Sequence, residues 1–243
     1  MTSALDQLCA ALSDGTQQLG LLLSPEQHAA CLAHWALVQA HNARAGLTSL
    51  SDPAEVAHKH YLDSLTCLLI RDLVEGERVA DLGSGAGFPG LVLAIVRPQA
   101  RFTLLDSSQK RADFLRLAAT ELGLANVEVV TSRAEEAGRN HEHRERYDVV
   151  TARALAPLRI LLEYGLPLAR VGGCLLAMKG PEAETELAAS QHALSVLGAG
   201  EVQTRHVTLP DGAGERVLIL VEKREATPSR YPRVAGVPGR RPL

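Results

Sequence analysis

The fold of this 243-residue chain is decided by Asp81-Leu82-Gly83-Ser84-Gly85-Ala86-Gly87-Phe88-Pro89-Gly90. This stretch follows a short run of β-type residues at 78–82 and leads into an apolar, helix-like segment at 89–96. Glycines allow the backbone to turn tightly and to approach a ligand, and the N-terminus of a helix offers free N–H groups. A strand, a glycine turn and a helix in this order predict the nucleotide-binding corner of an α/β sheet.

After this corner, β-type runs continue to alternate with helical stretches. The expected strands cover 78–82, 101–106, 127–131, 147–152 and 173–178, and the expected helices cover 89–96, 109–123, 155–170 and 182–197. Strands separated by helices indicate right-handed βαβ units and a mostly parallel, doubly wound sheet. Two more strands, 202–208 and 216–222, are joined by turn residues alone, so the last strand should run antiparallel to its neighbour. The expected fold class is therefore α/β.

Two flanking regions differ from this pattern. Residues 1–76 contain only helical signals, among them a capping box at Ser24-Pro25-Glu26-Gln27 and a second helix start at Asp52-Pro53-Ala54-Glu55. We expect a helical extension packed on a core domain at 77–224. The tail at 225–243 is rich in proline and, from Thr227 onward, has four arginines and no acidic residue. Such a tail is expected to lack regular structure and to contact phosphates.

The composition excludes several classes of protein. The formal net charge of −3 excludes a uniformly basic nucleic-acid binder, so any such binding must use local patches. Only 3 Phe, 4 Tyr and 1 Trp are present, which disfavours sheets that stack RNA bases on aromatic rings. The four cysteines form no CxxC pair, and we expect them to be reduced. Without a signal peptide or a long apolar run, the chain is expected to be cytoplasmic.

The glycine loop fits more than one ligand. Residues 85–90 match GxGxxG, which keeps a dinucleotide possible, whereas a Walker A loop is excluded because no Gly-Lys-Ser/Thr follows. Asp81, at the strand end, would repel a pyrophosphate and attract the ammonium and sulfonium of S-adenosylmethionine. Asp106 ends the next strand, where a carboxylate accepts both ribose hydroxyls of either cofactor. Glu135 is expected near the adenine end of the same crevice.

Several motifs in combination resemble one known family. They are His60-Tyr61-Leu62-Asp63-Ser64-Leu65, the stretch 81–90, Leu105-Asp106-Ser107 followed by Lys110-Arg111, Ser132-Arg133-Ala134-Glu135, Ala152-Arg153-Ala154, Met178-Lys179-Gly180, and Tyr231-Pro232-Arg233 to Arg241-Pro242-Leu243. Over nearly its whole length the chain resembles the bacterial ribosomal RNA small subunit methyltransferase G family, also called glucose-inhibited division protein B. It departs from the pattern at 41–48, which lacks the Trp-Asn start and the second Asn common in relatives.

The resemblance implies a class I S-adenosylmethionine-dependent methyltransferase fold, Rossmann-like and seven-stranded. It implies methyl transfer from S-adenosylmethionine to N7 of one guanine in 16S rRNA, near the decoding region. The partner would be 16S rRNA or the small ribosomal subunit, with no DNA, membrane or metal involved.

The resemblance and the loop together predict three sets of site residues. The residues expected at the cofactor are Asp81, Gly83, Ser84, Gly85, Gly87, Phe88, Asp106, Ser107, Ala134, Glu135 and Arg153. The residues expected to act in catalysis are Arg133, Arg153 and Lys179. The residues expected to bind RNA are Lys110, Arg216, Arg230, Arg233, Arg240 and Arg241.

The residues after the fourth strand agree with N7 as the target. Thr151-Ala152-Arg153-Ala154 lacks the Asn/Asp-Pro-Pro motif common in enzymes that methylate exocyclic amines. Guanine N7 has a free lone pair at neutral pH, so neither a general base nor a covalent step is needed, and catalysis reduces to alignment. Arginine often grips guanine O6 and N7 together, so we expect Arg153 to bind the cofactor or O6 and leave N7 free.

Two other classes of protein share parts of this pattern. A dinucleotide-dependent oxidoreductase would use the same loop, and a ribosome-binding factor without activity would keep only the fold. Asp81, Asp106 and Arg153 argue against the second alternative. His60, Asp63 and Ser64 share one helical face, and the sequence leaves open whether they form a hydrogen-bond network or line the mouth of a pocket.

Overall fold

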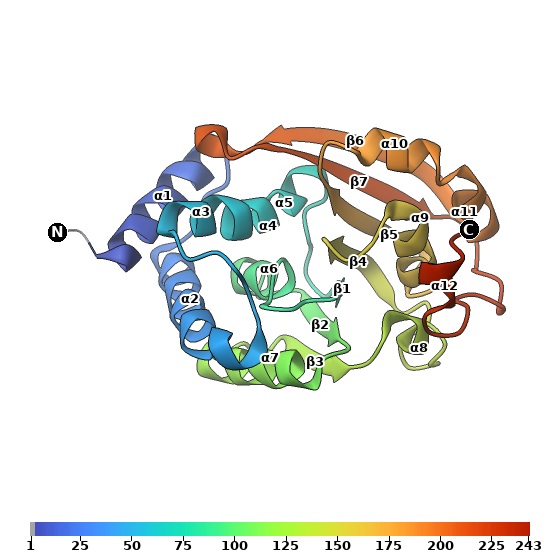
Figure 1. Ribbon diagram of the computed structural model, residues 1–243, viewed down its shortest axis with the longest axis horizontal. Coiled ribbons are helices and arrows are strands. Elements are labelled where there is room, and N and C mark those ends of the chain that lie inside the picture. Colours follow the sequence, from blue (N-terminus) through green and yellow to red (C-terminus); the bar gives the residue numbers. More distant parts are fainter. Residues whose placement is uncertain (1–2) are drawn as a thin grey trace.

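A seven-stranded sheet forms the centre of the computed structural model, which describes residues 3–243 (Figure 1). The strand order is β3-β2-β1-β4-β5-β7-β6. Neighbouring strands are parallel from β3 through β5, and β7 is antiparallel to both β5 and β6. The expected α/β class, with its antiparallel last strand, is confirmed. The strands are β1 Arg78–Leu82, β2 Arg101–Asp106, β3 Val127–Thr131, β4 Tyr147–Arg153, β5 Ala169–Lys179, β6 Ala199–Thr208 and β7 Glu215–Lys223.

Helices cover both faces of the sheet (Figure 1). On one face lie α1 Ala4–Gln18, α2 Pro25–Ala45, α3 Pro53–Val56, the π-helical turn Ala57–Leu62, α4 Asp63–Leu65, α5 Cys67–Ile70, α6 Gly90–Val96 and α7 Gln109–Glu121. On the other lie α8 Ala134–Ala137, α9 Leu158–Gly165, α10 Ala183–Ala188, α11 Gln191–Val196 and α12 Val237–Arg240. A short 3₁₀ turn, Pro210–Gly212, joins β6 to β7.

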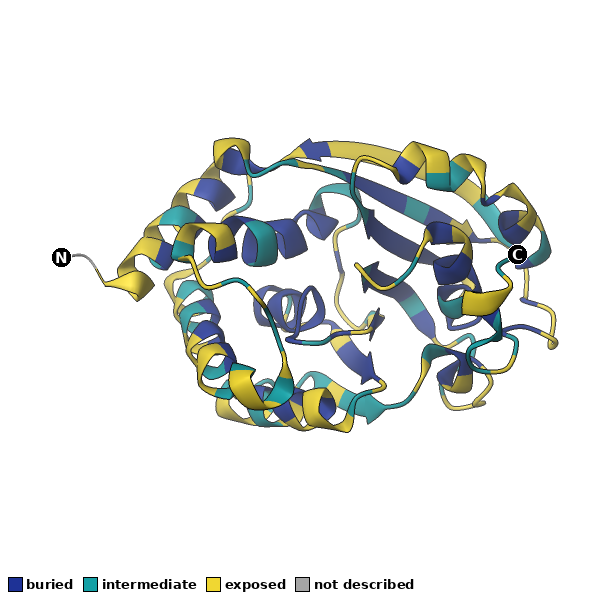
Figure 2. Ribbon diagram, in the orientation of Figure 1, coloured by how far each residue is buried: buried dark blue, intermediate teal, exposed yellow. Residues whose placement is uncertain are grey.

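Each face of the sheet buries its own hydrophobic core, and the outward surfaces of the helices remain exposed (Figure 2). Leu104 belongs to the core under α6 and α7, whereas its neighbour Leu105 belongs to the core under α9. Val149 and Val150 divide in the same way. Successive side chains of a strand point to opposite faces, so strands buried on both faces are apolar along their length, as in other parallel sheets.

Two predicted helices are shorter than expected. The helix predicted over 155–170 begins only at Leu158, because the chain first passes through a loop in which Ala154 has φ +50°. The helix ends at Gly165. The helix predicted over 182–197 is broken into α10 and α11 at Ser190. The Ser190 hydroxyl is buried and donates to the Glu186 carbonyl, a side-chain bond that competes with the helical backbone ladder.

The N-terminal helices pack directly on the sheet domain. Leu8 of α1, Trp35 of α2 and Tyr61 of the π-helical turn are buried in the same core as Leu91 of α6. The Ser24 side chain accepts from the Gln27 backbone and the Gln27 side chain accepts from the Ser24 backbone, which is the predicted capping box. The start of α2 is therefore set by local sequence, whereas its position depends on apolar burial against the core.

His34 joins α2 to the loop after β1. Its Nε2 lies 2.8 Å from the Ala86 carbonyl oxygen and its Nδ1 lies 3.0 Å from the Tyr61 hydroxyl. A carbonyl only accepts, so Nε2 carries the proton. The Tyr61 hydroxyl donates to the Cys31 carbonyl at 2.9 Å and lies beside the unprotonated Nδ1. Burial lowers the pKa of His34 to about 4, which keeps the ring neutral in this arrangement.

His34 should make the folded state less stable as the pH falls. Between pH 6.5 and about 4 the unfolded chain binds a proton at this side chain and the folded chain does not. The free energy of unfolding therefore decreases as the pH decreases through this range. His34→Gln keeps a hydrogen-bonding group but does not titrate. We expect the unfolding free energy of this variant to decrease less steeply than that of wild type as the pH is lowered. The two slopes should differ by up to about 1.4 kcal/mol per pH unit. Urea unfolding of both proteins from pH 7 to pH 4.5 measures the difference, and parallel curves would contradict it.

Candidate active site

The glycine turn after β1 is compact because side chains pack closely against it. Gly83, Gly85 and Gly87 all have positive φ, a conformation that L side chains rarely adopt. A Cβ on Gly87 would lie 2.5 Å from Leu91, and a Cβ on Gly90 would lie 2.4 Å from Leu104. The turn therefore needs glycine both for its backbone angles and for close packing of α6 on the sheet.

Asp81 lies behind this turn. Its side chain is fully buried, and its carboxylate accepts hydrogen bonds from the Gly90 N–H, at 3.1 Å, and from the Thr151 hydroxyl, at 2.9 Å. Burial raises the pKa of Asp81 to about 6. The sequence predicted that this carboxylate faces a ligand cation, whereas the structure places it between β1, β4 and the start of α6.

Asp106 holds the opposite side of the turn. One carboxylate oxygen accepts from the Gly85 N–H at 2.9 Å and the other accepts from the Ser108 N–H at 2.8 Å. These bonds connect the end of β2 to the glycine turn and to the start of α7. Each carboxylate oxygen keeps a second lone pair, so Asp106 still has acceptor capacity toward a ligand.

A first cavity of 270 Å³ opens at the carboxyl ends of β1 to β4. Of the predicted residues, it brings together Gly83, Asp106, Ser107, Arg133, Ala134, Glu135 and Arg153. Asp81, Ser84, Gly85, Gly87 and Phe88 do not line it and instead form or support the turn. Residues that were not predicted for this cavity also line it: Leu82, Leu105, Arg111, Ser132 and Ala154, each next to a predicted residue, and in addition Leu155, Tyr164 and Gly236. Leu155 follows β4 directly and could have been found from that position, whereas nothing local marks the other two.

The C-terminal tail forms part of the wall of this cavity. The Gly236 N–H donates to a Glu135 carboxylate oxygen at 2.8 Å, and Glu135 is only 4% exposed. Tail residues 237–240 form the short helix α12, so the prediction of a tail without regular structure is wrong at this point. The physical reason is that the tail is not solvated here but packs against α9 and α8.

Arg233 is the main anchor of the tail. Its Nη2 lies 2.6 Å and its Nε 2.8 Å from the two carboxylate oxygens of Glu163, and its backbone N–H also donates to Glu163. Glu163 is fully buried in α9. Arg144 adds bonds to the carbonyls of Thr227 and Tyr231, at 2.6 and 2.7 Å. The tail is therefore fixed by buried charge pairs and by backbone hydrogen bonds.

A second cavity of 640 Å³ adjoins the first, within the size range of small-molecule sites (about 300–1,000 Å³). The two cavities share Arg153, Ala154 and Leu155. Six charged side chains line part of the second cavity: Lys59, Asp63, Arg153, Lys179, Glu186 and Arg216. Four cations and two carboxylates give this cavity a net positive charge, unlike the chain as a whole.

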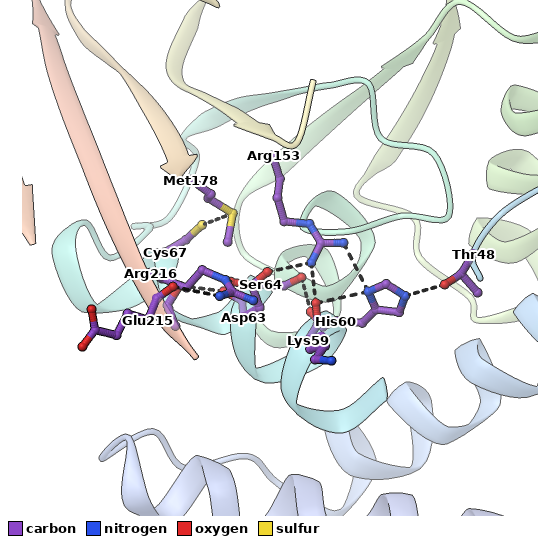
Figure 3. Close-up of polar contacts among 11 residues, drawn as sticks. Thr48, Lys59, His60, Asp63, Ser64, Cys67, Arg153, Met178, Glu215 and Arg216 are labelled. Carbon is purple, nitrogen blue, oxygen red and sulfur yellow. Dashed lines mark hydrogen bonds and ion pairs between the residues drawn. The ribbon is translucent and has the colours of Figure 1, made fainter. Parts of the chain in front are cut away.

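Arg153 occupies the boundary between the cavities (Figure 3). Its Nη1 donates to Asp63 Oδ2 and to the Lys59 carbonyl, both at 2.9 Å, and its guanidinium carbon lies 5.4 Å from the centre of the Phe88 ring. On Phe88 the His60 ring is stacked with 4.4 Å between centroids. Burial, followed by the Arg153 charge, lowers the pKa of His60 to about 4, so His60 is neutral near pH 7. The helical region at 57–63 thus contributes directly to the site.

Several known proteins are similar to this chain in sequence. The sequence model of the family described as rRNA small subunit methyltransferase G matches residues 27–215. A ribosomal RNA small subunit methyltransferase G from Symbiobacterium thermophilum is 47% identical over 237 residues, which cover 96% of each chain. Another from Lactobacillus johnsonii is 48% identical over 83% of this chain and 85% of the relative.

This chain belongs to the rRNA small subunit methyltransferase G family.

Solved structures support the fold at much lower sequence identity. A SAM-dependent O-methyltransferase from Thermotoga maritima aligns with a TM-score of 0.53 and 14% identity, over 78% of this chain and 72% of that one. A cofactor-bound protein, Rv0187 from MTB, aligns with a TM-score of 0.57 and 22% identity, over 81% and 90%. These similarities place the fold of this chain among methyltransferase folds.

The other predicted basic residues of this family member lie at the surface. Lys110 is exposed on α7, beside His41 and Arg44 of α2. Arg230, Arg240 and Arg241 are exposed on the tail. The departure from the family pattern at 41–48 does not loosen α2, because Asn42 bonds to the backbone of Leu47, Thr48 and Gly46.

Three further features bear on function: a hollow at the other end of the sheet, the placement of metal-binding side chains, and the length of the apolar helices. A hollow of 730 Å³ lies at the amino ends of β1 to β3, lined by Arg78, Arg101 and Asn126, whereas ligands of α/β sheets bind beyond the carboxyl ends. Within residues 3–243, no group of three or more His, Cys, Asp or Glu side chains is placed to hold a metal ion. The same residues contain no helix that combines the length and the apolar character of a membrane span.

Arg233→Ala should destabilise the folded protein strongly, because it leaves the buried Glu163 carboxylate without its charge partner. Breaking such a pair costs about 3–5 kcal/mol. Arg230→Ala is the matched control: its guanidinium is exposed and contacts only the Tyr231 ring in this region, so the change should cost about 1 kcal/mol or less. Urea unfolding at pH 7 compares the two variants, and equal stabilities would show that Arg233 does not anchor the tail.

Proposed function

We propose that this protein transfers a methyl group from S-adenosylmethionine to N7 of one guanine in 16S rRNA, near the decoding region. The observation that carries the proposal is the meeting of two cavities at Arg153, in a chain whose family is named for methylation of small subunit rRNA. The first cavity takes the methyl donor and the second takes the target base. Arg153 then lies where the two reactants meet.

The residues of the first cavity fit an adenosine-containing donor. The Asp106 carboxylate has free lone pairs for ribose hydroxyls, Ser107 follows it, and the backbone at Ala134 and Glu135 borders the far end. Gly83 keeps the entrance open on the side of Leu155, since a Cβ there would lie 2.8 Å from the Leu155 side chain. S-adenosylmethionine supplies a methyl group bound to a positively charged sulfur. Asp81, behind the turn, fixes the shape of this cavity.

The second cavity provides charge and alignment, and the proposed reaction uses neither a general base nor a nucleophile from it. The Lys179 ammonium donates to the Ala156 carbonyl and pairs with Glu186, both at 2.7 Å, so it holds the loop after β4 in place. Cys67 is buried against the sulfur of Met178 at 3.4 Å, and burial raises its pKa, which makes it a poor nucleophile. N7 attack needs neither group, because its lone pair is free at neutral pH. Arg153 orients the base through O6 or holds the donor.

Exposed arginines and lysines around the cavities bind the RNA in this proposal. Arg133 borders the first cavity, Arg216 borders the second, and Lys110, Arg230, Arg240 and Arg241 lie farther out. Arg233 is 26% exposed and paired with Glu163, so an RNA phosphate would compete with that pair. Local patches of this kind support phosphate contact in a chain of net charge −3. The reaction takes place in the cytoplasm, on free 16S rRNA or on the small subunit.

Methyl transfer to 16S rRNA should depend on Arg153. With labelled S-adenosylmethionine and unmethylated small subunits or free rRNA, we expect one N7-methylguanine per 16S molecule in wild type. Arg153→Gln should lower the rate on the order of a hundredfold, because misplaced reactants lose alignment. Arg170→Gln, which removes an ion pair with Asp148 at the opposite end of the sheet, should keep the wild-type rate.

Two results would overturn the assignment. Absence of N7-methylguanine in rRNA treated with wild type would reject the reaction. Thermal stabilisation by NAD and not by S-adenosylhomocysteine would favour a dinucleotide enzyme with the same fold. Arg153→Gln turnover equal to that of wild type would remove Arg153 from the mechanism and leave the reaction itself intact.

A further inference from the structure

Asp63 is a buried carboxylate shared by two arginines (Figure 3). It is 4% exposed and is the first residue of α4, directly after the π-helical turn. Its Oδ1 accepts from Arg216 Nε and its Oδ2 accepts from Arg153 Nη1, both at 2.9 Å. We name this arrangement the Asp63 bridge.

The Asp63 bridge joins parts of the sheet that do not touch each other. Arg153 ends β4 and Arg216 lies at the start of β7, with β5 between these strands. Arg216 Nη1 also donates to the Glu215 carbonyl of its own strand at 2.8 Å, whereas the hydrogen bonds of the Arg153 guanidinium go to residues 59–63. Asp63 comes from the N-terminal helices, so a third element fixes both groups on one side of the second cavity.

The N-terminal region also determines the remaining contacts of Arg153. The Lys59 carbonyl accepts from the same Nη1 at 2.9 Å, and the other terminal nitrogen lies 3.4 Å from His60 Nδ1. The Arg153 side chain is 16% exposed and the Arg216 side chain 22%, which leaves some of their N–H groups facing the cavity. A guanidinium has five N–H donors, and the bridge uses only part of them.

Charge gives the second reason for a carboxylate at this position. Lys59, Arg153, Lys179 and Arg216 all line the second cavity. Glu186 is already committed to Lys179 at 2.7 Å and to the Leu158 N–H. Asp63 is therefore the carboxylate that balances the two arginines beside a site where, in the function proposed above, the positively charged methyl donor must also bind. Without it, three positive charges would lie close together.

We propose that Asp63 is a positioning residue for the methyl transfer: it holds Arg153 and Arg216 in fixed orientation over the second cavity and offsets their charge. This inference rests on the proposed function for its reaction. The free N–H groups of the two arginines then face the base and its phosphate, and the donor cavity itself does not involve Asp63. The π-helical turn places Asp63 at this point of the helix.

The substitution Asp63→Asn separates this role from folding. The amide has nearly the same shape, but its NH₂ group would face an arginine donor and its charge is lost. We expect kcat/KM for 16S rRNA to fall on the order of a hundredfold. Calorimetric affinity for S-adenosylhomocysteine should stay within about threefold, since Asp63 does not line the first cavity. Asp63→Glu restores the charge and should recover part of the rate. This variant tests the proposal if the Asn variant does not fold.

Asp148→Asn is the matched control. Asp148 pairs with Arg170 at 2.6 Å and accepts from the Arg78 N–H at the opposite end of the sheet. Because the Arg170 side chain is 50% exposed, Asp148→Asn should lose less stability than Asp63→Asn, and it should keep the wild-type rate. A similar loss of rate in both variants would show that Asp63 acts only through stability and would overturn the proposal.

A double-mutant cycle tests whether Asp63 acts through its partners. If it does, the double variant Asp63→Asn/Arg216→Gln should lose less rate than independent effects would give. Its fold loss should be about tenfold smaller than the product of the two single fold losses. Losses that multiply would contradict the Asp63 bridge, as would an Asp63→Asn enzyme with the wild-type rate.

Labelling with phenylglyoxal gives a readout that needs no substrate. Peptide mapping should show faster modification of Arg153 and Arg216 in Asp63→Asn than in wild type, with Arg170 unchanged. Equal labelling rates would overturn the proposal even if wild type failed to methylate rRNA, and that failure by itself would reject only the proposed function.

Discussion

The buried carboxylate of Asp81 connects the elements that surround the glycine turn beside the first cavity. It bonds to the N–H of Gly90 at the start of α6 and to the hydroxyl of Thr151 in β4, and it lies at the end of β1. With Asp106 on the other side, the glycine turn is held between two carboxylates that both accept backbone N–H groups. A turn fixed in this way keeps one shape, and its residue Gly83 forms part of the wall of the first cavity.

The site is completed by segments from both ends of the chain. The N-terminal helices supply His34 beneath the turn, His60 against Phe88, and Asp63 between the arginines. The tail supplies Gly236 at the far side of the first cavity. The sheet therefore carries the cavities, and the flanking regions determine how their side chains are oriented. The helical extension therefore contributes side chains to the site as well as to the packing.

The sequence was sufficient where the deciding signals were local. The glycine turn, the alternation of strands and helices, the hairpin before β7 and the capping box at Ser24 each need only neighbouring residues, and the structure contains them all. Contacts between distant residues could not be predicted. Asp63 and Arg153 are 90 residues apart, and Gly236 and Glu135 are 101 apart. Nothing in a local pattern selects a partner at that distance. Asp81 illustrates the same limit, because its position at a strand end was evident but the groups that would cover it were not.

The contact between Gly236 and Glu135 has a consequence for how altered genes are interpreted. A stop codon at position 235 leaves every strand and the Arg233–Glu163 ion pair in place, yet removes the Gly236 contact with Glu135 in the wall of the first cavity. A shortened product of this kind can accumulate as a folded protein and still lack a closed cavity.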